Sequence, residues 1–188
     1  RDIADAHTYA VVDTHNTVPT GAGLASSAAG FAALATAASD AYGLDLNEQE
    51  LSRLARRGSG SAARSIHGGY VEWYRGEGDG LAGDLSSYAS PIDAHHLDMA
   101  LVVVVVDGGE KPIPSRQAMN STVATSPLYS AWAESSNQDL REMRDAIELG
   151  DVRAVGAIAE RNALGMHATM LAARPAIRYL TGRSLVVL

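Results

Sequence analysis

The chain has 188 residues, of which 46% are hydrophobic and 20% are charged, as expected for a globular protein of one or two domains. Its formal net charge of -7 argues against general nucleic-acid binding, because that function requires a basic surface. The sequence contains no cysteine, which excludes disulfides and thiolate metal sites and is typical of a reducing cytoplasm. We recognise no signal peptide, and the longest apolar run, 99–106, is too short to span a membrane.

The first predicted elements are a strand, a glycine-rich turn and a helix. The β-rich residues favour a strand over 9–16, and an alanine-rich run favours a helix over 28–42 that ends at Gly43. Between them, Gly21 and Gly23 allow backbone N–H groups to approach a ligand closely. A glycine-rich turn before a helix N-terminus is typical of a phosphate site, although a purely structural turn has the same composition.

A second helix is predicted from Asn47 onward. Asn47 and Glu50 have the spacing of a capping box, in which each side chain bonds the backbone of the other residue. Arg53, Arg56 and Arg57 follow toward the end of this helix, where cations complement the helix dipole. We prefer this purely structural role for Arg53.

A second candidate anion site comes directly after this helix. Ser59, Gly60 and Ser61 offer backbone amides and hydroxyls together, and Arg64 adds a guanidinium that can bind phosphate or carboxylate with two hydrogen bonds. A flexible linker is the alternative interpretation of this composition. It is weakened because residues 62–66 are helix formers and would orient the preceding amides.

The remaining pattern alternates between short apolar runs and longer amphipathic segments. A strand is predicted over 69–73 and a loop over 76–90, followed by a buried central strand over 101–106. Two helices are predicted over 137–149 and from Asp151 to about residue 170. His167 lies in the second of them and is expected to be a packed histidine rather than an active-site group.

Two sequence blocks resemble a known family. Residues 19–29, Pro-Thr-Gly-Ala-Gly-Leu-Ala-Ser-Ser-Ala-Ala, resemble the Pro-x-x-x-Gly-Leu-x-Ser-Ser-Ala phosphate loop of the GHMP kinase superfamily. Residues 52–69, Ser-Arg-Leu-Ala-Arg-Arg-Gly-Ser-Gly-Ser-Ala-Ala-Arg-Ser-Ile-His-Gly-Gly, resemble the signature of one branch, the diphosphomevalonate decarboxylases. The resemblance extends over 9–175 and implies a two-domain α+β fold, incomplete here at both ends. A ribosomal-S5-like N-terminal domain is expected over 1–95 and a ferredoxin-like C-terminal domain over 96–188.

The resemblance also implies roles for individual residues. The expected ATP-binding residues are Thr14, Asn16, Pro19, Gly21, Ala22, Gly23, Leu24, Ala25, Ser26 and Ser27. The expected substrate-binding residues are Ser59, Gly60, Ser61, Arg64, Ser115, Arg116 and Met119, although core packing is the alternative for Met119. Arg64 and Ser27 are expected to be catalytic, with Ser27 also the metal ligand. Ala63 stands where the family has a serine, which removes one expected hydroxyl contact.

The implied activity is ATP-dependent decarboxylation of (R)-5-diphosphomevalonate to isopentenyl diphosphate, ADP, phosphate and CO₂, with ATP and Mg²⁺ as cofactors. The partners would be these small molecules and not a nucleic acid or a membrane, and a homodimer is allowed. A sister enzyme, such as a phosphomevalonate decarboxylase or a mevalonate 3-kinase, remains an alternative. A non-catalytic phosphate-binding module is a second one.

Two segments of the family are not found in this sequence. One is an early Lys-Tyr-Trp-Gly-Lys segment, and the other is a late Asp-Ala-Gly-Pro-Asn segment whose aspartate serves as the catalytic base. No acidic residue can therefore be assigned as the base by motif. Because the chain begins at Arg1 and ends on an apolar run, 185–188, we expect it to be the middle of a larger protein. We do not expect these residues alone to catalyse the implied reaction.

Overall fold

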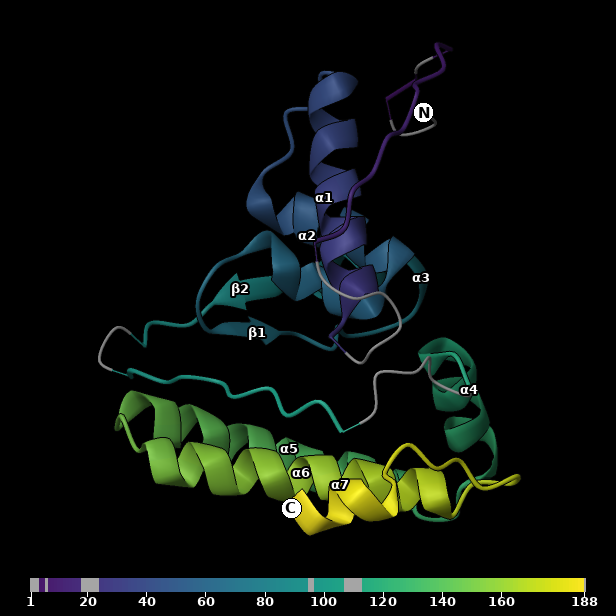
Figure 1. The fold of residues 1–188 in the computed structure, drawn as a ribbon. Coiled ribbons are helices and arrows are strands. Elements are labelled where there is room, and N and C mark those ends of the chain that lie inside the picture. The colour runs from purple at the N-terminus through teal and green to yellow at the C-terminus, as the bar shows by residue number, and fades with distance from the viewer. Residues whose placement is uncertain (1–3, 6, 18–23, 95–96, 107–112, 188) are drawn as a thin grey trace. The chain divides into compact units, whose positions relative to one another are not determined.

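A computed structural model of the chain describes residues 4–5, 7–17, 24–94, 97–106 and 113–187. The chain divides into two compact units, Arg1–Asp93 and Ala94–Leu188, and each is described here by itself. The first unit combines helices with a small sheet, whereas the second is helical in its regular elements (Figure 1). This mixture of helices and strands agrees with the expected α+β class.

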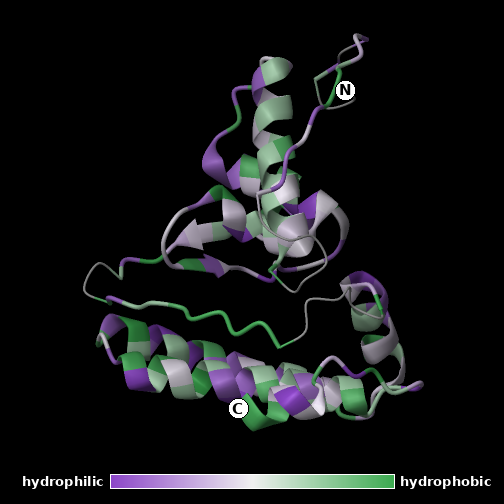
Figure 2. Cartoon of the chain, viewed as in Figure 1, coloured by the Kyte–Doolittle hydropathy of each residue, from purple (hydrophilic) through white to green (hydrophobic). Residues whose placement is uncertain are grey.

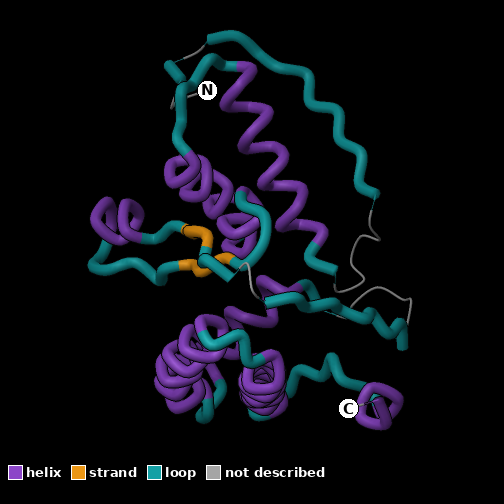
Figure 3. Tube along the Cα trace, turned by 90° about the vertical axis from the view of Figure 1, so that its left-hand side faces the viewer, coloured by secondary structure: helices purple, strands orange, loops and turns teal. Residues whose placement is uncertain are grey.

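The described part of the first unit contains three α-helices, a 3₁₀-helix and two short strands. In chain order these are α1 Ser26–Ala41, α2 Glu48–Gly58, η1 Gly60–Ile66, β1 Val71–Trp73, α3 Gly80–Ser86 and β2 Ala89–Pro91. The strands pair antiparallel, with Trp73 opposite Ala89 (Figure 3). The helices α1 and α2 both pack against η1, so the core of this unit lies among these three elements.

Local sequence signals begin and end the first two helices as predicted. Helix α1 forms from an alanine-rich run, and Gly43 follows it with a φ of 65°, a left-handed conformation that glycine adopts at little cost. At the start of α2, the side chain of Asn47 accepts from the backbone N–H of Glu50 at 3.0 Å. The Glu50 carboxylate accepts in return from the backbone N–H of Asn47 at 3.0 Å, which confirms the capping box.

The core of the first unit is built mainly from alanine. Ala35 of α1, Ala55 of α2 and Ala62 of η1 form one buried cluster, with Leu54 and Ile66 packed at its edge. Because an alanine side chain is a single methyl group, the three helical backbones can approach one another closely. This close approach brings the beginning of α1 next to the beginning of η1.

A buried serine fixes the position of η1. The hydroxyl of Ser52, which is fully buried, donates to the carbonyl of Ala63 at 2.9 Å and accepts from the backbone N–H of Ala89 at 2.8 Å. One side chain of α2 thereby holds η1 on one side and β2 on the other. Burial of these backbone groups would be costly without the hydroxyl, because each would lose its hydrogen-bond partner.

Three arginines of α2 converge on one carboxylate of α3. Asp84 contacts Arg53 at 2.6 Å, Arg56 at 2.5 Å and Arg57 at 3.3 Å, with the Asp84 side chain only 17% exposed. The hydrogen bond from Arg53 is the largest cause that holds the pKa of Asp84 below its usual range. The structural role preferred for Arg53 agrees with this contact, but its partner is a carboxylate distant in sequence in place of the helix dipole.

In its described residues, the second unit has four helices, α4 Ser115–Thr125, α5 Tyr129–Glu148, α6 Val152–Leu171 and α7 Gly182–Val187. Helices α5 and α6 lie side by side and run in opposite directions (Figures 1 and 3). Asp151 caps α6 as predicted, since its carboxylate accepts from the backbone N–H of Ala154 at 3.0 Å. Of the helices in the described ranges, none is both long and apolar enough to cross a membrane.

Two predicted strands are absent from the residues that the structure describes. The segments 9–16 and 101–106 are extended but belong to no sheet, because the sheet found in the described ranges holds only β1 and β2. The prediction that 101–106 is buried was wrong: Leu101 is 87% exposed, and Figure 2 shows the segment as continuously hydrophobic. The physical reason is that a strand depends on hydrogen bonds to a neighbouring strand, which an apolar pattern does not supply.

The predicted loop over 76–90 also needs correction. This segment contains α3 and the start of β2, together with glycines that turn the chain before α3. Its glycine, aspartate and serine content suggested a loop. The helix is instead fixed by tertiary contacts, above all by the ion pairs between Asp84 and α2.

We predict that the Asp84→Asn variant unfolds with a free energy lower by about 2 kcal/mol at neutral pH, the scale of hydrogen bonds between charged groups. The pKa of Asp84 is depressed below its ordinary value of about 3.9 in the folded state. Its stabilisation is therefore complete above that pH and is lost as the pH falls through the folded pKa. Urea unfolding between about pH 2 and pH 7 measures this.

The exposed Asp45 provides the matched control, because Asp45→Asn changes the same charge on the same unit without touching the arginines. The difference between wild type and Asp84→Asn should shrink below about pH 4. A difference that stayed constant through this range would show that the Asp84 charge does not stabilise the fold.

Candidate functional site

The first part of the candidate site is the N-terminus of α1. Ala25, the residue before the helix, has a φ of 52°, a left-handed conformation that a residue with a Cβ adopts at a cost. Ala25 supplies no side-chain cap, and among the described residues no side chain accepts from the first N–H groups of the helix. Ser26 and Ser27 begin the helix at this point, and Ser27 is exposed. Free amides, the helix dipole and two hydroxyls together favour an anion here.

The second part is the turn from α2 into η1. Ser59 links the two helices in an extended conformation, and Gly60 begins η1. A Cβ atom on Gly60 would lie 2.9 Å from Cη2 of Trp73, so only glycine fits without moving the indole ring. Gly58 is equally restricted, because a Cβ there would overlap the ring of Phe31 on α1. Both glycines therefore mark places where backbone and ring pack in close contact.

The two parts meet through serine hydroxyls. The Oγ atom of Ser27 lies 3.4 Å from that of Ser59, although the two residues are 32 positions apart. The Oγ atom of Ser59 lies 3.4 Å from that of Ser61 in turn. Three hydroxyls from two predicted anion-binding segments thus converge at one place in the first unit.

Arg64 is the cation of this region that differs from its neighbours. Within the residues that the structure describes, its guanidinium has no carboxylate within ion-pair distance, whereas Arg53 and Arg56 both bind Asp84. The guanidinium carbon of Arg64 lies instead 5.6 Å from the centroid of the Trp73 ring. Its charge is therefore not neutralised by the described part of the protein and is available for an anionic ligand.

The other predicted site residues are distributed differently. Thr14 and Asn16 are exposed in the extended segment before α1, while Leu24 and Ala25 lead into that helix. The four remaining residues of the predicted ATP loop, Pro19, Gly21, Ala22 and Gly23, lie outside the described residues.

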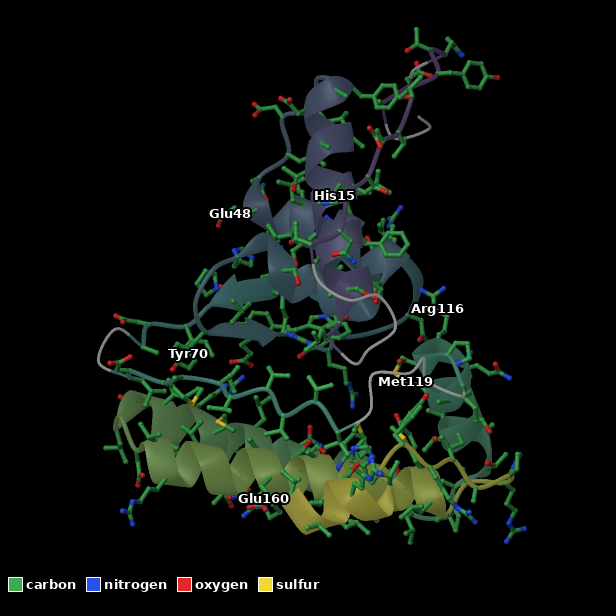
Figure 4. All side chains as sticks on the ribbon, in the orientation of Figure 1. His15, Glu48, Tyr70, Arg116, Met119 and Glu160 are labelled. Atoms are coloured by element: carbon green, nitrogen blue, oxygen red, sulfur yellow. The ribbon has the colours of Figure 1, made fainter. Side chains whose placement is uncertain are left out.

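The predicted substrate residues of the second unit lie on α4. Ser115 and Arg116 form its first turn and are exposed, and Met119 is 54% exposed (Figure 4). Because they belong to the other unit, their approach to Ser59 stays a prediction. His167 is half-buried in α6, and burial lowers its pKa, which is the behaviour of a packed histidine.

Sequence reasoning did not identify the residues that support the site from behind. Ser52 holds η1, Asp84 holds the arginines of α2, and Trp73 lies against both Gly60 and Arg64. Ser52 belongs to the 52–69 signature block but had no role assigned to it, and Trp73 and Asp84 lie outside both blocks. The sequence did offer Gly60, because a glycine can mark a position where another group packs against the backbone. It does not indicate that this group is the ring of Trp73.

Two family models together match most of the chain. The diphosphomevalonate decarboxylase-like N-terminal domain matches residues 1–89, and the mevalonate 5-diphosphate decarboxylase C-terminal domain matches residues 101–188. Among related proteins, diphosphomevalonate decarboxylase mvd1 of Aspergillus fumigatus is 42% identical over 168 residues, which cover 89% of this chain and 41% of that protein.

Solved structures give the same result. One described as MDDEF in complex with MVAPP, AMPPCP and magnesium is 44% identical with a TM-score of 0.82, covering 90% of this chain and 51% of that one. The mevalonate diphosphate decarboxylase from Staphylococcus aureus is 41% identical with a TM-score of 0.79, covering 90% of this chain and 50% of that one.

The fold is thus that of the GHMP kinase superfamily, as the phosphate-loop resemblance implied. Within it, the chain belongs to the diphosphomevalonate decarboxylase family. The chain spans about half the length of the relatives it matches.

We predict that the double variant Ser59→Ala plus Ser61→Ala binds inorganic pyrophosphate at least about 10-fold more weakly, because two hydroxyl donors to a charged group are lost. Calorimetric titration of the intact protein measures this. Ser130→Ala, an exposed serine of α5, is the matched control and should bind as the wild type does. Unchanged affinity in the double variant would mean that these hydroxyls do not contact the anion.

Proposed function

We propose that the intact protein catalyses the ATP-dependent decarboxylation of (R)-5-diphosphomevalonate to isopentenyl diphosphate, ADP, phosphate and CO₂. Family membership supports this, as do relatives named for this activity and the solved structure with MVAPP, AMPPCP and magnesium. The single observation that carries it is the convergence of the Ser27, Ser59 and Ser61 hydroxyls in the unit that also holds Arg64, an arginine with no carboxylate partner among the described residues.

The two anion segments would have different ligands. The N-terminus of α1, with Ser26 and Ser27, would hold the phosphates of ATP, because a helix N-terminus preceded by a turn presents amides to an anion. Ser59, Gly60 and Ser61 would bind the diphosphate of the substrate, with Ser115 and Arg116 contributing from α4. The Oγ atoms of Ser27 and Ser59 are 3.4 Å apart, which is close enough for the two ligands to lie side by side.

The chemistry would proceed in two stages. The γ-phosphoryl group of ATP is transferred to the tertiary 3-hydroxyl, which converts a poor leaving group into phosphate. The C–O bond to that phosphate then breaks, and the electron pair of the bond between the carboxylate carbon and C2 becomes the new C2–C3 double bond as CO₂ leaves. Positive charge develops at C3 in this step, so positioning and charge neutralisation account for most of the catalysis.

Arg64 would hold the departing carboxylate. Its planar guanidinium can bind both carboxylate oxygens and keep them in one plane, which a lysine ammonium cannot do. The absence of a carboxylate partner in the described part of the chain supports this assignment over that of a surface ion pair.

The residues present fit Mg²⁺ as an ion shared with the nucleotide. Mg²⁺ prefers oxygen ligands and usually takes only one or two from the protein, with the rest from phosphates and water. The exposed hydroxyl of Ser27 can supply one such ligand, and the described residues contain no cluster of acidic or histidine side chains that would bind a metal without a phosphate. When bound, the ion would neutralise phosphate charge.

We predict that Arg64→Lys in the intact protein lowers kcat by about 10²–10³-fold, the effect of losing one preorganised electrostatic contact. The KM for ATP should change little, because Arg64 is assigned to the substrate carboxylate. Steady-state kinetics with diphosphomevalonate measure both constants. Arg153→Lys, on the exposed face of α6, is the matched control and should keep wild-type turnover.

Near-normal turnover in Arg64→Lys would contradict this assignment. Arg64 would then be a surface residue whose ion pairs contribute about 0–1 kcal/mol to stability. The same assay with 5-phosphomevalonate and mevalonate separates the proposed reaction from those of sister enzymes. Preference for the diphosphate is expected, because the hydroxyls of Ser59 and Ser61, together with the amides of Gly60 and Ser61, offer more donors than one phosphate needs.

A further inference from the structure

The guanidinium of Arg64 is restrained by an aromatic ring. The separation of 5.6 Å between its central carbon and the centroid of Trp73 is within the range of a cation–π interaction. Tryptophan is the strongest partner for such a contact among the aromatic side chains. The same ring lies against Gly60, where a Cβ would come within 2.9 Å of it. One side chain of β1 therefore contacts both the proposed diphosphate-binding turn and the proposed carboxylate-binding cation.

The far edge of this ring is fixed by hydrogen bonds. The indole Nε1–H of Trp73 donates to the hydroxyl of Ser87 at 3.2 Å, and that hydroxyl donates to the carbonyl of Tyr74 at 3.1 Å. Ser87 is only 4% exposed, and its own carbonyl accepts from Arg56 at 3.0 Å. The ring is thus held between a buried serine on one edge and Arg64 on one face.

An arginine that packs on an aromatic ring keeps its charge and donors available, whereas an arginine bound to a carboxylate does not. Asp84 forms ion pairs with Arg53 and Arg56 and occupies some of their N–H donors. The face of an indole ring attracts a guanidinium without accepting its in-plane N–H groups, so the charge and the bidentate donor edge both stay available. Such a contact reduces the conformational freedom of Arg64 while leaving its binding capacity intact.

We propose that Trp73 is a positioning residue, which orients Arg64 toward the carboxylate of the substrate. This inference deepens the proposed function and rests on it. Trp73 itself touches no reacting atom. Its effect on catalysis passes through Arg64, and Ser87 acts by holding the ring.

The test is a double-mutant cycle in the intact protein, measured by steady-state kinetics with diphosphomevalonate. Trp73→Leu removes the aromatic face and should lower kcat about 10-fold, which corresponds to about 1.4 kcal/mol, with little change in the KM for ATP. Trp73→Phe retains a weaker face and should recover most of that loss. In the Arg64→Gln background, Trp73→Leu should lower kcat by less than about 2-fold, because the group it positions is already gone.

Ser87→Ala provides a second route if Trp73→Leu does not fold. It frees the indole N–H without altering the ring, so it should lower kcat in the wild type and not in the Arg64→Gln background. Trp132→Phe is the matched control, since Trp132 belongs to the second unit, where its indole N–H donates to the backbone carbonyl of Asn162. Its kcat should stay at the wild-type value.

The outcomes separate the two claims. If Arg64→Gln itself leaves kcat unchanged, the assignment of Arg64 under the proposed function fails. If Arg64→Gln is impaired but the Trp73 and Ser87 effects multiply with it, the role of Trp73 is purely structural and this inference is overturned. Loss of the Trp73 effect in the absence of Arg64 supports it.

Discussion

Close approach between backbones is the constraint on which the first unit depends. Ala35, Ala55 and Ala62 form the contact between α1, α2 and η1, and none of them is more than 7% exposed. A larger side chain at this contact would move α1 away from η1, and with it Ser27 away from Ser59. The 3.4 Å separation of those two hydroxyls is therefore a product of the core, and packing and site cannot vary independently.

A second constraint divides the positive charges of this unit into two classes. Arg53 and Arg56 are bound by Asp84 and connect α2 to α3, so their charges serve the fold. Arg64 lies on an indole face instead, and its charge is left for a ligand. Because the chain has a net charge of -7, an anionic substrate needs a site at which a positive charge is not paired with a carboxylate. The choice of partner, carboxylate or aromatic ring, thus decides which arginines stabilise and which can bind.

Local chemistry made part of this structure predictable from sequence. The capping box of Asn47 and the left-handed Gly43 depend only on residues a few positions apart, and the glycine- and serine-rich turns predicted the two segments whose serine hydroxyls meet. What depends on distant contacts was missed. The ion pairs of Asp84 join residues about 30 positions apart, and the apolar run 101–106 is extended without a sheet in the described residues. Motif resemblance supplied the family, which periodicity alone would not have done.

The central claim is that Ser27 and the Ser59–Ser61 turn bind two different anionic ligands side by side. The most direct test is a crystal structure of the intact protein with diphosphomevalonate, AMPPCP and Mg²⁺. The account predicts the substrate diphosphate within hydrogen-bond distance of the Ser59 and Ser61 hydroxyls, and the nucleotide phosphates at the N-terminus of α1. A structure with both ligands bound and neither of these contacts formed would contradict it.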